Sequence, residues 1–555
     1  MEKKDDSKVD VLVVGAGPAG LACAIQLKKA RPEIRVCVVE KSGELGGHNL
    51  SGTVMEPGPL HRLLDEAVGD WRQTEQAKEI LSRKVTKDQV MFLAGKKWSL
   101  GISFAVTLAK LFRLGFGQMK NRGYYIVSVS RLTKWLGDIA KQLGVEIATS
   151  FGVEDIIWDQ AKCTAMGVKL ADQGRDKEGK PQPNFISGEV IGADFVILAE
   201  GCDGLVTEKF AEKAQLQRQG NQLYSVGIKE IIKVSPQQYE KFGDGRVVHA
   251  MGYPLWTPVI GPNMFGGGVL YSYGENQIMA AIIVGADWKY CDFNPQQALT
   301  QFKEHRFVKP FIDGGEVVEA GAKMIPEGGY YAIPRDIQTD AIGNGNVLIL
   351  GDSAGFVNML KIKGLHNAIE SGMLAGKVVA ESLEQPVLAA VKYTRLLEAS
   401  NIGKEMRSAK NSRQTIAKFG PELGLPLSAL GPLLPKFNIE KDYDKTTSVR
   451  FKHAGGEEFD KAAFTALAHT QHREDQRCHL DILVPAICQN SCATKFGRPC
   501  VSFCPGGVYD VIEGQLRAAN PSNCLHDKSC QRKCPFDNIR WTVPEGGSGP
   551  GYKQM

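Results

Sequence analysis

The C-terminal stretch from Cys478 onward constrains this chain more than any other part of its sequence. Eight of the chain's 13 cysteines lie within the last 78 residues, which is too dense for the isolated small core residues that cysteines usually are. Two runs each end in a Cys-Pro pair, and their members are Cys488, Cys492, Cys500 and Cys504, then Cys524, Asp527, Cys530 and Cys534. This concentration predicts a metal centre.

The second run has the spacing of the bacterial ferredoxin motif C-x2-C-x2-C-x3-C-P, with Asp527 at the second cysteine position. In that motif three ligands of one loop bind one iron–sulfur cluster, and the cysteine before the proline binds another. Such crossing would form two sets, Cys504, Cys524, Asp527 and Cys530, and Cys488, Cys492, Cys500 and Cys534. The first run also resembles the half of seven-iron ferredoxins that holds a three-iron cluster. The sequence therefore predicts one [4Fe-4S] cluster and leaves open a second, [3Fe-4S] or [4Fe-4S].

Asp527 is the departure from the ferredoxin motif. A carboxylate oxygen is a harder ligand than a thiolate, so this corner of the cluster could be carboxylate-bound, exchangeable, or vacant as in a three-iron cluster. Zinc is an alternative for cysteine-rich runs, although structural zinc needs only four ligands and neither run is a pair of CxxC motifs. A disulfide framework fits less well, because no secretory signal precedes the cysteines.

The length and charge of the chain set broad limits. Its 555 residues are enough for two to four domains, and 43% hydrophobic with 23% charged residues is ordinary globular composition. No apolar run approaches the roughly 20 residues that cross a bilayer, and the polar N-terminus lacks the apolar core of a signal peptide. The net charge of +5 gives no argument for a nucleic acid partner, so none is expected, and it permits an anionic membrane surface.

Residues 9–40 carry a dinucleotide-binding fingerprint. A β-branched run is followed by Gly15-Ala-Gly17-Pro-Ala-Gly20, a helical stretch, a second β-branched run and Glu40. Gly15 makes the tight turn, Gly17 lets the backbone approach a pyrophosphate, and Gly20 allows helix and strand to pack. The helix N-terminus attracts the anion, and Glu40 is expected to accept from ribose hydroxyls. The alternative is a glycine turn without a ligand.

Two further short strands, at 194–198 and 346–350, lead into turns that contain Asp203 and Gly351-Asp352. The second turn resembles the flavin motif in which the aspartate holds ribityl or ribose hydroxyls and the next helix N-terminus faces the pyrophosphate. Three motifs in this order predict FAD rather than NAD. No second GxGxxG occurs, so we expect the flavin to receive electrons from something other than NADH.

Several segments resemble one known family, the electron transfer flavoprotein-quinone oxidoreductases: residues 40–57, 121–138, 224–230, 249–255, 355–376 and 543–555. The resemblance spans nearly the whole chain. It implies FAD bound partly by Gly364 of the Lys361–Gly364 segment, and it implies cluster ligands at Cys504, Cys524, Cys530 and the position of Asp527. Family members are known with a single four-iron cluster, so the remaining four cysteines of the two runs are extra to that pattern.

The resemblance also implies an activity. Electrons from a reduced electron transfer flavoprotein would pass through an iron–sulfur cluster and FAD to a membrane quinone, ubiquinone or menaquinone, as in an electron-transferring-flavoprotein dehydrogenase. Gly266 and Gly267 match the family's quinone-contacting glycines, the alternative being a strand-edge bulge. No catalytic side chain is demanded, and protons could come from solvent or from a residue such as His249 or Tyr271.

Membrane contact is expected at two mostly apolar segments, residues 98–119 and 420–435. Both suit a surface that dips into one leaflet without spanning it, and the alternative is that both are buried inside the protein. The family's monotopic membrane binding favours insertion. The expected location is the cytoplasmic face of a prokaryotic inner membrane.

The expected architecture is an α/β flavoprotein with a GR2-type (Rossmann-like) FAD-binding fold, an inserted α+β quinone-binding domain and a C-terminal ferredoxin-like iron–sulfur domain. The expected divisions are 1–204 and 336–440 for the FAD-binding domain, 205–335 for the quinone-binding domain, 441–475 for a connector and 476–555 for the iron–sulfur domain. Two rival functions stay open: a soluble geranylgeranyl-reductase-type enzyme that reduces a lipid double bond, and a non-catalytic electron-carrying subunit of a bifurcating flavoprotein complex.

Overall fold

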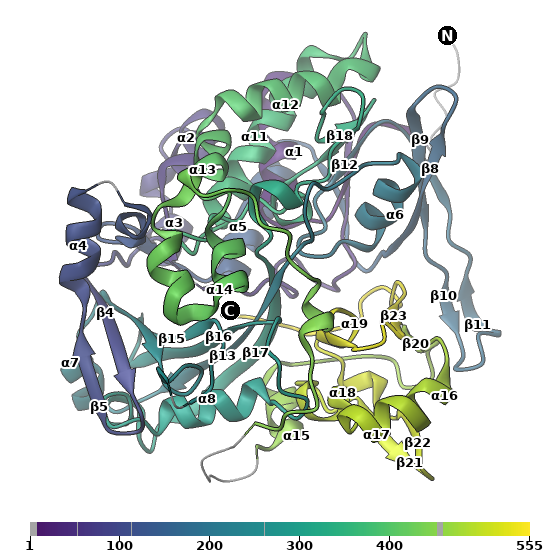
Figure 1. Cartoon of the computed structure of the whole chain (residues 1–555). Helices are drawn as coiled ribbons and strands as arrows, with labels where there is room; N and C mark the ends of the chain where they lie inside the picture. Colours follow the sequence, from purple (N-terminus) through teal and green to yellow (C-terminus); the bar gives the residue numbers. More distant parts are fainter. Residues whose placement is uncertain (1–7, 53, 113, 260, 452–458) are drawn as a thin grey trace, which may run out of the picture.

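The computed structural model describes residues 8–52, 54–112, 114–259, 261–451 and 459–555. Position 113 of the first apolar segment and residues 452–458 of the expected connector lie outside these ranges. The described chain forms two large sheets with covering helices, and a smaller C-terminal unit that lies against both (Figure 1).

The first sheet is the flavin-type sheet that the N-terminal fingerprint predicts. Its strand order is β18-β19-β12-β1-β2-β7, and the neighbours from β19 to β7 pair in parallel. A parallel sheet is covered on both faces, which is why its strands are continuous apolar runs. The strands are β1 (Lys8–Val14), β2 (Val36–Val39), β7 (Glu146–Ala148), β8 (Val153–Asp159), β9 (Thr164–Leu170), β12 (Val190–Leu198), β18 (Gly343–Asn344) and β19 (Val347–Ile349).

Helices α1 (Pro18–Ala30) and α11 (Leu365–Glu381) of this half pack closely against each other. Small residues permit the approach, since a Cβ added at Gly372 would lie 2.2 Å from the carbonyl oxygen of Ala19. The other helices of this half are α2 (Gly58–Ala67), α3 (Glu75–Ile80), α5 (Val129–Gln142), α6 (Leu205–Lys213), α10 (Gly351–Ala354), α12 (Ala389–Ala399) and α13 (Asn401–Ser408).

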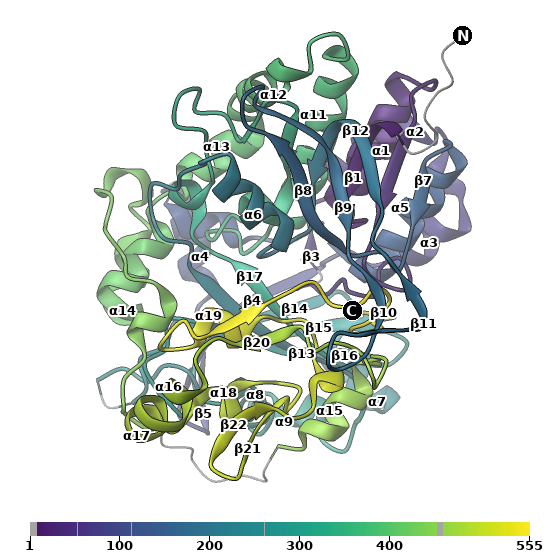
Figure 2. The ribbon, with the colours of Figure 1, turned by 90° about the vertical axis from the view of Figure 1, so that its right-hand side faces the viewer.

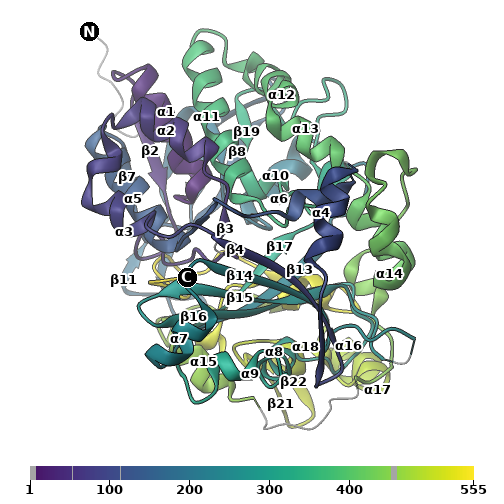
Figure 3. The same cartoon turned by 90° about the vertical axis from the view of Figure 1, so that its left-hand side faces the viewer.

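The second sheet has the order β17-β13-β16-β15-β14-β4-β5 and is antiparallel except for the β14–β4 pair. Its outer face is covered by α8 (Pro295–Lys303), and its other face looks toward the first sheet (Figure 3). The strands are β4 (Lys87–Ala94), β5 (Trp98–Gly101), β13 (Tyr224–Lys233), β14 (Arg246–Gly252), β15 (Gly266–Gly274), β16 (Gln277–Gly285) and β17 (Glu316–Pro326). Strands β4 and β5 precede residue 205, yet they extend the sheet of the inserted segment.

The C-terminal unit packs beneath the second sheet and beside the flavin-type sheet (Figure 2). Its elements are short, as cysteine-rich loops require, and two hairpin-like pairs, β20–β23 and β21–β22, hold them together. They are α15 (Lys461–Leu467), β20 (Leu480–Ile482), α16 (Pro485–Ile487), α17 (Ala493–Phe496), α18 (Pro499–Phe503), β21 (Tyr509–Ile512), β22 (Gln515–Ala518), α19 (Ser529–Lys533) and β23 (Ile539–Trp541).

Two helices stand apart from these layers. Helix α4 (Ser103–Leu111) follows β5, and α14 (Ser412–Ser428) breaks at Gly420, where φ is 71° and ψ 171°. In Figure 3 they lie on the same side of the molecule, and the amide of Gly115 just beyond α4 donates to the carbonyl of Ala429 at 3.1 Å. No helix in the described ranges is long and apolar enough to cross a bilayer.

Candidate functional site

A cavity of about 430 Å³ lies between the two sheets. It opens at the carboxyl ends of β1 and β12, where parallel sheets place their ligands. Its walls combine residues of the flavin motifs, the start of β15 and the loop 526–528 of the C-terminal unit. Three segments far apart in sequence therefore share one space.

The three glycines of the fingerprint have different surroundings. At Gly15, where φ is +101°, an added Cβ would lie 2.5 Å from the carbonyl oxygen of Ala199. At Gly20 an added Cβ would lie 2.1 Å from the carbonyl oxygen of Gly15. Both positions are therefore closed to any larger residue. At Gly17 the nearest atom would be Asn49 Nδ2 at 3.8 Å, and Gly17 lines the cavity. The open space before α1 fits a pyrophosphate that approaches the backbone.

Glu40 lies at the end of β2 and lines the cavity. Its Oε2 accepts from the amide of Ala16 at 2.8 Å, and its Oε1 accepts from the amide of Ser42 at 2.8 Å. These bonds orient the carboxylate beside the glycine turn. An ionised carboxylate can accept more than two hydrogen bonds, so capacity remains for ribose hydroxyls.

Gly351, Asp352 and Gly364 bring two helix starts to the same cavity. Asp352 and Gly364 line it, and burial raises the pKa of Asp352 to about 6. Gly351 has a φ of +53° and lies behind the wall, against Ala19 and Ala368. Asp352 is thus placed for ligand hydroxyls, while Gly351 allows the close packing of α1 and α11.

Asp203 is placed differently from the other flavin-motif residues, because it is not among those that line the cavity. Its carboxylate is paired with Arg532 of α19, whose Nε donates to Oδ2 at 2.8 Å. Burial alone would raise the pKa of Asp203, but the Arg532 charge lowers it below its ordinary value. In the structure Asp203 joins the flavin-type sheet to the C-terminal unit.

Gly266 and Gly267 both line the cavity, next to the flavin-motif wall. An added Cβ would lie 2.2 Å from the Ile283 carbonyl oxygen at Gly266 and 2.4 Å from the Ala250 carbonyl oxygen at Gly267. Close strand packing alone therefore demands glycine here. The same two glycines also expose backbone to the cavity, so strand packing and ligand contact are compatible.

His249 and Tyr271 form a hydrogen-bonded pair in the wall beside these glycines. Tyr271 Oη and His249 Nε2 are 2.6 Å apart. Burial lowers the pKa of His249 to about 3, so its ring is neutral, and the tautomer of that ring decides whether Tyr271 or His249 donates in this pair. His249 Nδ1 is buried and has no protein partner in the described chain. It is the polar atom of this wall that a ligand could engage.

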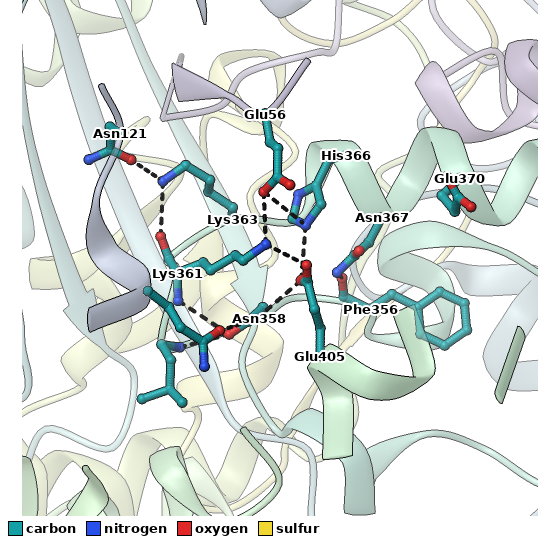
Figure 4. A network of polar contacts seen from close by, with 12 residues as sticks. Glu56, Asn121, Phe356, Asn358, Lys361, Lys363, His366, Asn367, Glu370 and Glu405 are labelled. Carbon is teal, nitrogen blue, oxygen red and sulfur yellow. Dashed lines mark hydrogen bonds and ion pairs between the residues drawn. The ribbon is translucent and has the colours of Figure 1, made fainter. Parts of the chain in front are cut away.

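The segment from Lys361 to Gly364 is fixed by the polar network of Figure 4. Lys361 Nζ bonds Glu56 Oε2 at 2.8 Å and also Glu405, which accepts from His366 Nε2 at 3.0 Å. Against the effect of burial, His366 and Lys361 lower the pKa of Glu405 to about 2. The Lys361 ammonium group already balances the charge of the Glu56 and Glu405 carboxylates, so no metal is needed between them. The network therefore serves to position the cavity wall.

Sequence reasoning missed the buried cations of the cavity. Lys41, Lys229, Lys323 and Lys363 line it, and burial lowers the pKa of each, to about 7 for Lys41 and Lys229 and about 8 for Lys363. Cations in an enclosed site favour an anionic ligand. Lys229 and Lys323 stand inside the mostly apolar strands β13 and β17, and a charge in such a strand was the available signal.

A histidine group was also missed. The rings of His472, His479 and His526 pack together, and His472 Nε2 lies 3.0 Å from His526 Nε2. Burial lowers the pKa of His472 to about 4 and of His479 to about 3, so these rings are neutral. His526 lines the cavity and follows Cys524 by two positions. That proximity in sequence to a cluster ligand was the available signal.

Cys504, Cys524, Asp527 and Cys530 come together as the spacing predicts, all with at most 7% of their surface exposed. Burial, then the charges of Cys530 and Cys504, raises the pKa of Cys524, which places these thiols close to one another. The amide of Val508 donates to Cys504 Sγ at 3.5 Å. Four buried donors with hydrogen bonds to sulfur fit an iron–sulfur cluster. The other four cysteines of the two runs are also buried nearby.

An apolar face lies outside the cavity. It is made of exposed side chains of β5, α4 and the end of α14, and it consists of Trp98, Leu100, Phe104, Leu108, Leu111, Phe112, Leu423, Leu427, Leu430 and Leu433. Trp98 is 78% exposed and Leu433 86%, so the alternative, in which these segments are buried inside the protein, does not hold. Several large exposed apolar side chains on neighbouring elements mark a membrane or protein contact.

Known protein families match the flavin, quinone and iron–sulfur parts of the chain separately. Residues 10–268 match the family model of FAD dependent oxidoreductases, 224–325 that of the ubiquinone-binding part of ETF-QO, and 455–553 that of the electron transfer flavoprotein-ubiquinone oxidoreductase 4Fe-4S domain. A solved geranylgeranyl bacteriochlorophyll reductase-like protein of Thermoplasma acidophilum superposes with a TM-score of 0.54 at 17% identity, over 78% of this chain and 92% of that one. This likeness supports the fold.

Two curated relatives cover the full length. The mitochondrial electron transfer flavoprotein-ubiquinone oxidoreductase of Arabidopsis thaliana is 33% identical over 100% of this chain and 85% of its own. The Pseudomonas aeruginosa electron transfer flavoprotein-ubiquinone oxidoreductase is 32% identical over 100% of both chains. The predicted family and fold class are thereby confirmed, and the chain belongs to the electron transfer flavoprotein-ubiquinone oxidoreductase family.

Proposed function

We propose that this chain is a membrane-surface oxidoreductase that accepts electrons from reduced electron transfer flavoprotein and passes them, through an iron–sulfur cluster and FAD, to a quinone. One observation carries the proposal: flavin-motif residues, the glycines of β15 and the cluster loop 526–528 line one cavity. Donor side, flavin and acceptor are thus expected within a single enclosed site.

The residues proposed to hold FAD are those of the first sheet. Gly15, Gly17 and Gly20 leave room for the pyrophosphate at the start of α1, while Glu40 and Asp352 accept from hydroxyls. Gly364 precedes α11 and adds a second helix start, and Asp203 supports the site by docking the C-terminal unit. When bound, a flavin would supply the exchange of one or two electrons, and the protein supplies its binding and orientation.

The proposed cluster ligands are Cys504, Cys524, Asp527 and Cys530. Their loop continues into the cavity wall through His526 and Lys528, and Lys528 also bonds the backbone of Asp203. The loop therefore fixes the cluster ligands relative to the flavin wall. An iron–sulfur cluster exchanges one electron at a time and so suits a flavoprotein donor.

The proposed quinone position is the part of the cavity beside Gly266 and Gly267. His249 and Tyr271 provide polar atoms there, and Val269, Ala281 and Ile283 add apolar wall of the kind that a quinone site requires. No nucleophile is involved. The pair can orient a carbonyl oxygen, while protons reach the quinone from solvent or through this pair.

We infer peripheral membrane contact through the apolar face, at the cytoplasmic side of a prokaryotic inner membrane. The proposed division of the chain remains 1–204 and 336–440 for FAD, 205–335 for the quinone, 441–475 for the connector and 476–555 for the cluster. The second sheet accepts β4 and β5 from the first part, so the quinone-side layer is built from two stretches.

An anaerobic assay tests the function. Purified protein is mixed with pre-reduced electron transfer flavoprotein and a short-chain ubiquinone, and the absorbance of both flavins is followed. We expect the donor to be oxidised only when protein and quinone are both present. Reoxidation by an unsaturated geranylgeranyl lipid but not by quinone would favour the reductase alternative, and no turnover without a co-purifying partner would favour the subunit alternative.

A further inference from the structure

The same backbone turn occurs at two places in the C-terminal unit. Arg498, with φ of 61°, precedes α18, and Lys528, with φ of 60°, precedes α19. Each helix has five residues, carries a buried cysteine at its second position and ends before a Cys-Pro pair, at Cys504 and Cys534. The left-handed conformation at both N-caps is uncommon for residues other than glycine, so its recurrence marks equivalent backbones.

The hydrogen bonds to sulfur repeat as well. Cys504 Sγ accepts from the amides two and four residues later, the latter, that of Val508, at 3.5 Å. Cys534 Sγ also accepts from the amides two and four residues later, the latter, that of Asn538, at 3.3 Å. Cys534 thus has the same surroundings as Cys504, a proposed cluster ligand.

Cys534 belongs to the second cysteine run in sequence, but in space it lies beside the cysteines of the first run. Asn538 donates through its amide to Cys534 Sγ and through its side-chain Nδ2 to Cys488 Sγ, both at 3.3 Å. Cys492 lies close enough to Cys534 and Cys488 for their charges to act on it. Cys500 lies equally within reach of Cys534, Cys492 and Cys488. These four cysteines, here called the outer set, are mutual neighbours, and each has at most 6% of its surface exposed.

The geometry of the outer set excludes two other uses of cysteine. None of the chain's 13 cysteines forms a disulfide. Zinc–sulfur bonds of about 2.3 Å at tetrahedral angles hold thiolates about 4 Å apart. In the described ranges, groups of three metal-binding side chains with donor atoms within 4.8 Å of one another contain histidines and glutamates, and no cysteine belongs to them. The sulfurs are spread more widely than one ion requires, which suits a larger polynuclear centre.

We propose that Cys488, Cys492, Cys500 and Cys534 bind a second cluster, a [4Fe-4S] cube with four thiolate ligands. Cys500 also neighbours Cys530, so the two ligand sets are adjacent. The cavity is lined by His526, Asp527 and Lys528 of the other loop, and no member of the outer set is among its lining residues. The second site therefore adjoins the first ligand set and does not border the flavin cavity.

Metal analysis tests this site without relying on turnover. Iron, acid-labile sulfide, zinc and flavin are measured on anaerobically reconstituted protein, as the wild type and as Cys488→Ala, Cys492→Ala and Cys478→Ala. Cys478 lies in the same unit, is half-buried and belongs to neither set, so Cys478→Ala is the matched control. Flavin content and circular dichroism report folding of each variant.

We expect about eight iron atoms per flavin in the wild type and control, or about seven where the Asp527 corner is vacant. Each outer-set variant should lose about four, and the electron paramagnetic resonance spectrum after dithionite should change from two interacting signals to one. About four iron atoms in the wild type, unchanged iron in both variants, or zinc in place of iron would overturn the proposal. A three-iron signal abolished by Cys492→Ala would equally contradict a four-thiolate cube.

These outcomes are independent of the proposed function. A protein with about eight iron atoms that failed to reduce quinone would retain the second cluster and lose the quinone assignment. A protein with about four iron atoms that reduced quinone normally would keep the quinone assignment and lose the second cluster. The wild-type iron content decides the question even if every cysteine variant fails to fold.

Discussion

At Asp527 a carboxylate stands where the ferredoxin motif has a thiolate, and the residue is buried with a hydrogen bond from Ser529. We predict that Asp527→Cys converts an easily lost iron to a permanent one, because thiolate is the softer and tighter ligand. After aerobic gel filtration the variant should keep about one more iron atom per flavin and show no three-iron signal. The control is Asp510→Cys, an exposed aspartate of the same unit. Equal iron retention in both variants and the wild type would remove Asp527 from the ligand set.

Tyr271 is the residue whose loss should separate quinone chemistry from cofactor binding. Its hydroxyl lies 2.6 Å from His249 Nε2, and Tyr271→Phe leaves that buried nitrogen unpaired at a cost of about 1–3 kcal/mol. We predict a rise of roughly tenfold in the KM for quinone, with unchanged iron and flavin content. Tyr239→Phe serves as control, since that hydroxyl bonds exposed Asp244 far from the cavity. The idea fails if both variants reduce quinone as the wild type does.

For single residues, the sequence predicts the position of a side chain best when the residues that it contacts are near it in the chain. Gly15, Gly20 and Glu40 interact within one βαβ unit, so the spacing alone predicts their arrangement. Asp203 was expected at the flavin, but its carboxylate pairs with Arg532, more than 300 positions later. No local pattern could reveal this partner. The crossed grouping of the cysteines was predictable because it repeats a known spacing.

Among the elements, β5 and α4 carry most of the apolar face. Phe104 and Leu111 are 64% and 74% exposed, and burying such side chains in lipid stabilises binding by roughly 1.5–3 kcal/mol each. We predict that Phe104→Asp combined with Leu111→Asp weakens binding to anionic phospholipid vesicles at least about tenfold in a flotation assay. Reduction of a short-chain quinone in solution should persist.

The control for this prediction is Ile186→Asp combined with Val190→Asp. These residues are 58% and 50% exposed but lie at β11 (Pro181–Ile186) and β12, on the opposite side of the flavin-type sheet from α4 (Figure 2). Equal loss of vesicle binding in the two double variants would show that the effect is general to exposed apolar residues. No loss in either would argue against lipid contact at α4.

Elements were predicted less completely than motifs. The strands predicted at 9–14 and 36–39 from β-branched runs on either side of a helical stretch are present in the structure. Strands β4 and β5 were not expected to leave the first part of the chain. Their place is decided by the parallel pairing of β4 with β14, across about 160 residues, and such long-range pairing leaves no trace in the local pattern.

For the whole molecule, the Arg532–Asp203 pair is a main polar bond between the C-terminal unit and the flavin-type sheet. Arg532→Met would leave the buried Asp203 carboxylate uncompensated, which costs about 3–5 kcal/mol. We predict a melting temperature lowered by several degrees, together with faster iron loss. Arg517→Met, an exposed arginine in the same unit, should melt as the wild type. Adding Asp203→Asn should recover part of the loss, and equal melting of the two arginine variants would refute the docking role.

The apolar face and the cavity share walls, since Leu425 and Ser428 of α14 and Met119 beyond α4 line the cavity from within. A hydrophobic molecule dissolved in a bilayer could therefore enter without crossing water. For such an enzyme the effective substrate concentration is the number of quinones per unit of membrane area, and encounter is a two-dimensional search. Turnover should then follow the mole fraction of quinone in the lipid, and diluting the vesicles in buffer should leave the rate per bound enzyme unchanged.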